Sequence, residues 1–146
     1  PEGSSITLPD DATNLSRALY LLGQAELLTF KDNKTTGLTL EDIDSNPKNL
    51  NLDDQVPLTS LAQRYTETGL AIMYPTYAIS LELVGDEERL FSEGQDDVTE
   101  GYAISLVSRD DNKDSEKIQT LIKHVTSEEV RQLLIDDYDW ASTPAF

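Results

Sequence analysis

The spacing of apolar and polar residues changes period within the first part of the chain. Ile6 and Leu8 are apolar on either side of one polar residue, which is the two-residue period of a strand. The segment Pro9–Asp11 is suited to a turn that ends the strand. Beyond it, apolar residues return every three or four positions, as on one face of a helix. The pattern predicts a strand followed at once by a helix, with Asp11 or Thr13 as its cap.

The rest of the chain alternates in the same way between short apolar runs and amphipathic stretches. The apolar run over residues 69–74 predicts a buried strand, and Tyr102–Ser108 predicts another. Strands that alternate with helices predict an α/β fold with a mostly parallel sheet flanked by helices. Further helices are expected near residues 39–42, from Pro57, over Thr76–Val84, over Ile118–Val125 and from Ser127. Further short strands are expected at Leu50–Leu52 and Arg89–Ser92. A polar connection is expected over Asp96–Gly101, and a packed tail from Asp139.

The first turn of the predicted N-terminal helix carries Asn14 and Arg17 on one side. The first N–H groups of a helix favour an anion, and a guanidinium can grip a carboxylate with two parallel bonds. The end of a strand in an open α/β sheet is also where such sheets bind ligands. One interpretation is therefore a seat for a small acid. The other is that Arg17 simply pairs with Asp10 or Asp11 on the surface.

Composition narrows the classes of function. Among 146 residues, 11 are basic and 28 are acidic, and the formal net charge of −17 argues against a nucleic-acid partner. The same charge favours a second hypothesis, an acidic protein-interaction domain that binds a basic surface and no small ligand. The absence of cysteine excludes disulfides and cysteine-ligated metals. No apolar run reaches membrane-spanning length.

No residue pattern predicts catalysis, a metal site or a cofactor. His124 is the only histidine, and no nucleophile can be paired with it. The acidic runs do not match a calcium loop, and phosphate-binding and zinc-protease motifs are missing from the sequence. A small hydrolase that uses an Asp/Glu pair therefore ranks last among the hypotheses, and the chain is not expected to be an enzyme.

Several segments carry motifs of one known family in a fixed order. Residues 8–22, LPDDATNLSRALYLL, are similar to P-N-D-P-T-N-x-G-R-A-L, and residues 42–50, DIDSNPKNL, to D-I-x-E-N-P-K-N-L. Residues 74–78, YPTYA, fall where the family has N-x-x-Y-A, and residues 102–109, YAISLVSR, resemble Y-x-N-x-I-V-x-R. DNKD, SEEV and a terminal PAF follow. Together they resemble the methionine-binding lipoprotein family, the NlpA-type substrate-binding proteins of ABC importers.

The resemblance implies a periplasmic-binding-protein-like (type II) fold with two lobes and a ligand between them. Residues 1–100 would be the second lobe, and residues 101–146 a segment that returns to the first lobe, whose N-terminal part is expected outside this chain. The implied function is to bind an amino acid, methionine-like or another small carboxylate, and to present it to an ABC permease. The implied location is extracytoplasmic, with a lipid anchor to the cell membrane in the full-length parent.

The family's motifs also assign roles to residues of this chain. Its arginine and asparagine that hold the ligand carboxylate correspond to Arg17 and Asn14. Two further family asparagines fall on Tyr74 and Ile104, which cannot make the same amide contacts, so an amino acid other than methionine is also plausible. The expected ligand-binding residues are Asn14, Arg17, Tyr74, Tyr77, Tyr102 and Ile104.

The C-terminal segment, Tyr102–Phe146, is expected to have an apolar stripe that needs cover. Without its own lobe, the segment would either dock on the rest of this chain or exchange with a second copy. The second case would give a segment-swapped homodimer.

Overall fold

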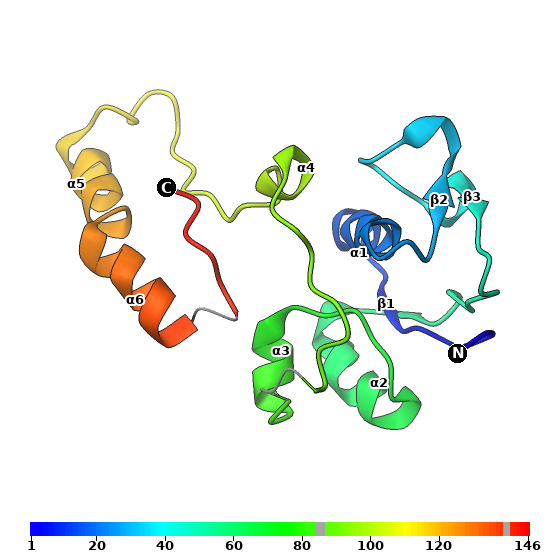
Figure 1. The fold of residues 1–146 in the computed structure, drawn as a ribbon. Helices are drawn as coiled ribbons and strands as arrows, with labels where there is room; N and C mark the ends of the chain where they lie inside the picture. The colour runs from blue at the N-terminus through cyan, green and yellow to red at the C-terminus, as the bar shows by residue number, and fades with distance from the viewer. Residues whose placement is uncertain (84–86, 139–140) are drawn as a thin grey trace. The chain divides into compact units, whose positions relative to one another are not determined.

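A computed structural model describes residues 1–83, 87–138 and 141–146 of the chain (Figure 1). It forms two compact units, Pro1–Thr99 and Glu100–Phe146. Each unit has its own local structure and is described by itself.

The strands of the first unit are short and include a parallel pair. They are β1 (Leu8–Pro9), β2 (Thr29–Phe30), β3 (Ile43–Ser45) and β4 (Gln55–Val56). β1 pairs with β4 in parallel and β2 pairs with β3 antiparallel. Single residues extend the parallel arrangement, with Ser5 beside Asn51 and Thr7 beside Ala71. The predicted N-terminal strand is confirmed, although it extends to Pro9. The backbone N–H of Asp10 continues the pairing by donating to the Val56 carbonyl (3.0 Å).

The helix that follows β1 is α1, Ala12–Gln24, and it confirms the predicted change of period. Asp11 is its cap, because the Asp11 carboxylate accepts the backbone N–H of Asn14. The other helices of the first unit are α2 (Leu61–Thr68), α3 (Pro75–Ser80) and the one-turn 3₁₀ segments η1 (Lys31–Asn33), η2 (Leu40–Asp42) and η3 (Leu58–Ser60). The short helix α4 (Asp97–Glu100) begins in the first unit and ends at the first residue of the second.

The core of the first unit lies between α1 and the parallel strands. α1 packs against β1, as Figure 1 shows, and Leu8 and Leu19 have no exposed surface. The buried cluster consists of Ile6, Leu8, Ala18, Leu19, Leu22, Leu28, Leu38, Leu50 and Leu52. Burial of these side chains fixes the first turn of α1 relative to the end of β1.

The second unit contains two consecutive helices, α5 (Glu116–Val125) and α6 (Glu128–Tyr138). Both were predicted from the apolar spacing. Ser115 caps α5 by accepting the backbone N–H of Ile118 (3.4 Å). Many large apolar side chains of this unit are exposed, including Ile104, Val107 and Leu133.

Several predicted elements differ from the structure. Tyr102–Ser108 is not a strand, because within the described residues it pairs with no other strand and its backbone has no ladder to join. The run 69–74 is half-buried and contributes only the single pairing at Ala71. Arg89–Ser92 is irregular, and the polar connection contains α4.

The boundaries of two helices also differ from prediction. The helix near residue 39 is a single 3₁₀ turn, closed by mutual hydrogen bonds between Thr39 and Asp42, and β3 follows it directly. α3 ends at Ser80, and a left-handed backbone at Glu82 (φ 60°) stops its continuation. Val84, where that helix was expected to end, lies outside the described residues, as do Asp86 of one acidic run and Asp139 and Trp140 of the tail.

In the described ranges, no helix is both long enough and apolar enough to cross a membrane.

Candidate functional site

The first turn of α1 holds Asn14 in a fixed orientation. Both carboxylate oxygens of Asp11 accept from the Asn14 side-chain nitrogen, at 3.0 and 2.9 Å, in addition to the capping bond from the Asn14 backbone. The backbone N–H of Asn14 is the main reason that the pKa of Asp11 lies below its ordinary value. The amide nitrogen of Asn14 therefore points to Asp11, and its oxygen is directed to another partner.

That partner is Tyr74, the residue that precedes α3. The Tyr74 hydroxyl donates to Asn14 Oδ1 (2.7 Å) and accepts from Arg17 Nη1 (3.2 Å). The guanidinium also lies over the Tyr74 ring, 5.2 Å from its centre, which is within the range of a cation–π contact. Tyr74 thus joins the two residues that the spacing in α1 singled out.

Arg17 binds a carboxylate that lies far away in the sequence. Arg17 Nε donates to Glu93 Oε2 (2.8 Å), and Arg17 Nη2 donates to Glu93 Oε1, so the contact has the two-point form. About a quarter of each side chain is exposed. The hydrogen bonds to Glu93 are the main cause of a raised pKa of Arg17, which keeps the guanidinium charged.

The segment that carries Glu93 is attached to α1 at further points. The backbone N–H of Gly94 donates to Gln24 Oε1 (3.2 Å). The Asp96 carboxylate accepts from the Tyr20 hydroxyl (2.6 Å) and from Gln24 Nε2 (2.9 Å). The Tyr20 hydroxyl is the main reason that the pKa of Asp96 is lowered. Positions 17, 20 and 24 of α1 therefore form one polar stripe along which residues 93–96 run.

The structure brings together three of the six predicted site residues, Asn14, Arg17 and Tyr74. Tyr77 is close in sequence only to Tyr74, and in the first turn of α3 its backbone N–H donates to the Tyr74 carbonyl (3.0 Å). Tyr102 and Ile104 belong to the second unit, and the Ile104 side chain is fully exposed there.

Sequence reasoning missed Glu93, which is one of 28 acidic residues and has no local motif to mark it. It is the residue that holds the two-point contact with Arg17.

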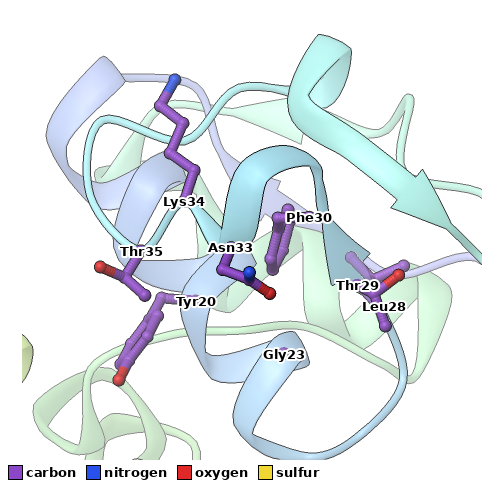
Figure 2. A pocket seen from close by; sticks show the side chains of 8 residues that line it. All are labelled: Tyr20, Gly23, Leu28, Thr29, Phe30, Asn33, Lys34 and Thr35. Atoms are coloured by element: carbon purple, nitrogen blue, oxygen red, sulfur yellow. The ribbon is translucent and has the colours of Figure 1, made fainter.

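A shallow pocket of about 250 Å³ lies elsewhere on the first unit, between α1 and the β2 region. Figure 2 shows its walls, with Gly23 at the helix, the Phe30 ring beside it and the Lys34 side chain pointing away from the Tyr20 hydroxyl. Lys34 is paired with Asp42 (2.8 Å). None of the six predicted site residues lines this pocket.

Asn14, Arg17 and Tyr74 form one hydrogen-bonded group, the Arg17 cluster. The Arg17 guanidinium has the charge and the fork of donors that suit a carboxylate, and Tyr74, whose hydroxyl donates to Asn14, contacts it through a hydrogen bond and the ring face. Within residues 1–83, 87–138 and 141–146, no group of three or more His, Asp or Glu side chains is placed to hold a metal ion.

Comparison with known proteins gives a consistent set of relatives. A family model described as NlpA lipoprotein matches residues 1–146. The chain is 37% identical over 131 residues to a Haemophilus influenzae protein named probable D-methionine-binding lipoprotein MetQ. That match covers 90% of this chain but only 46% of the relative, so the chain spans about half the length of the relative.

Solved structures give the same result at the level of the fold. A YaeC-family lipoprotein from Enterococcus faecalis superposes with a TM-score of 0.82 at 30% identity, and the match covers 100% of this chain and 60% of that one. The substrate-binding protein of a methionine transporter from Streptococcus pneumoniae superposes with a TM-score of 0.80 at 27% identity, covering 100% and 56%. These similarities confirm the predicted fold class, an α/β lobe of the periplasmic-binding-protein type.

Proposed function

The chain belongs to the NlpA lipoprotein family, and we propose that it is the ligand-binding part of a substrate-binding protein of an ABC importer. Its ligand is an amino acid, methionine-like or another small carboxylate, which it binds outside the membrane and presents to a permease. The full-length protein is anchored to the membrane by a lipid. The activity is binding, with no chemical step.

The observation that supports this proposal is the two-point carboxylate contact on Arg17. The guanidinium, in the first turns of a helix that follows a parallel strand, already receives a carboxylate in the described structure. Tyr74 and Asn14 flank it through the hydrogen bonds described above. A ligand carboxylate needs the same charge and the same fork of donors.

The proposal extends to the organisation of the whole protein. Residues 1–100 are the second of two lobes, residues 101–146 return to the first lobe, and the ligand binds between the lobes, as closure around a ligand requires. In this arrangement Tyr77, Tyr102 and Ile104 shape the part of the site that faces the ligand side chain. The comparisons give the alternative acidic interaction domain no support, and the segment-swapped homodimer stays a prediction.

The test is isothermal titration calorimetry of the full-length protein with L-methionine, D-methionine and the other common amino acids. Arg17→Ala is expected to weaken binding at least about tenfold, which is ~1.4 kcal/mol, because it removes the guanidinium that is proposed to bind the ligand carboxylate.

The matched control is Arg64→Ala, which also breaks contacts of an arginine with carboxylates, those of Asp54 and Glu67. It should leave affinity unchanged. Equal affinity of Arg17→Ala and wild type, with both proteins folded by circular dichroism, would remove Arg17 from the site.

A further inference from the structure

Each of the three guanidinium nitrogens of Arg17 donates to a side chain of its own chain. Its Nε and Nη2 hold the Glu93 carboxylate, and its Nη1 donates to the Tyr74 hydroxyl. A second carboxylate on the same guanidinium would lie beside Glu93, and two like charges at that separation repel each other. Glu93 and a ligand carboxylate therefore exclude one another from the two-point position.

We infer that Glu93 is an intramolecular competitor for the carboxylate-binding position on Arg17. A ligand carboxylate must displace Glu93 before it can bind there. This inference rests on the proposed function, because it needs Arg17 to be the group that binds the ligand carboxylate. It adds a regulatory element, since the affinity of the site then depends on how firmly Glu93 is held.

The anchoring of the Glu93 segment makes the competition effective. Asp96, three residues further on, is fixed on α1 by Tyr20 and Gln24, and its other oxygen accepts the backbone N–H groups of Val98 (3.0 Å) and Thr99 (2.8 Å). A carboxylate tethered this close to its partner acts at a high effective concentration. After displacement Glu93 stays near Arg17 and can return when the ligand leaves.

The exposure of the pair keeps the competition modest. The Arg17 and Glu93 side chains are 23% and 26% exposed, so water can solvate Glu93 once it is released. Partly exposed ion pairs are weak, and loss of this one should tighten ligand binding by only about fivefold. A competitor of this strength tunes affinity without blocking the site.

The test compares the affinity of the full-length protein for L-methionine in wild type, Glu93→Gln and Glu93→Ala. Both variants are expected to bind about fivefold more tightly, because each removes the competing charge. Glu88→Gln is the matched control, since it removes the same charge from an exposed residue of the same unit that lies outside residues 93–96.

The outcomes separate this inference from the proposed function. Unchanged or weaker binding by the Glu93 variants, together with loss of binding in Arg17→Ala, would overturn the competitor and leave the proposed function intact. Equal tightening in Glu88→Gln would also overturn it, because the effect would then come from net charge. Failure of wild type and every variant to bind L-methionine or any other amino acid would overturn both proposals.

Discussion

Removal of the Tyr74 hydroxyl is the most selective test of the cluster around Arg17. Tyr74→Phe deletes one oxygen that donates to Asn14 Oδ1 at 2.7 Å and accepts from Arg17 Nη1 at 3.2 Å. The aromatic ring stays, so the contact between the guanidinium and the ring face is kept. The change therefore isolates two hydrogen bonds from packing.

The expected loss of folding stability follows from these contacts. A hydrogen bond in a folded protein contributes about 1 kcal/mol net, and one to a charged group contributes somewhat more. The bond to Arg17 is long, and the residues involved are half-buried, so water can replace part of what is lost. The free energy of unfolding should fall by about 1–1.5 kcal/mol, and amino-acid affinity by roughly five- to tenfold.

Urea unfolding measures the first quantity, and calorimetry with L-methionine measures the second. Tyr65→Phe, on the half-buried side of α2, is the control and should change neither. If Tyr74→Phe and Tyr65→Phe have the same stability and the same affinity, the Tyr74 hydroxyl does not organise Asn14 and Arg17.

Two further changes test the frame around the site. Thr7 is fully buried, and its hydroxyl donates to Asp54 Oδ2 (2.5 Å). Thr7→Val should therefore lower the free energy of unfolding, measured in urea, by about 1–2 kcal/mol. Thr66 is exposed, so Thr66→Val is the control and should change this free energy little. Hydrogen bonds from Lys34 and Thr39 lower the pKa of Asp42 from 3.8 to about 2. A carboxyl with a depressed pKa stabilises the fold above its ordinary pKa, and this contribution is lost as pH falls through 3.8 towards 2. In Asp42→Asn the melting temperature should therefore fall less steeply between about pH 4 and pH 2 than in wild type. An equal slope of melting temperature against pH in the two proteins would contradict this assignment.

The part of the fold that sequence predicted best is the passage from β1 to α1. Both elements can be recognised from a few residues. The alternation at Ile6 and Leu8 and the three-to-four spacing after Asp11 each reflect which face of the element is buried. Asp11 as the cap follows equally from local chemistry, since its side chain reaches the N–H of Asn14 three residues on. The placement of Asn14 and Arg17 on one side of the first turns could be predicted for the same reason.

The remainder of the site could not be read in this way. Glu93 lies 76 residues from Arg17, and Tyr74 lies 57 residues from it, so their meeting depends on the packing of the whole unit. The motif resemblance pointed to Tyr74, because its position is that of a family asparagine. Glu93 had no such mark, and the sequence interpretation that offered Asp10 or Asp11 as partners of Arg17 considered only near neighbours.

The strand predicted at Tyr102–Ser108 is absent from the described structure, because a local pattern does not determine whether a neighbouring strand is available. Its residues have strong strand preference, yet a strand is stable only when its N–H and C=O groups find a neighbouring strand. Within the described residues the segment has none, and Ile104, Leu106 and Val107 are exposed. In the proposed two-lobe protein, the missing neighbour would belong to the first lobe, to which this segment returns. In that arrangement the segment would form its strand only beside the first lobe, which would account both for its alternating pattern and for its irregular backbone here.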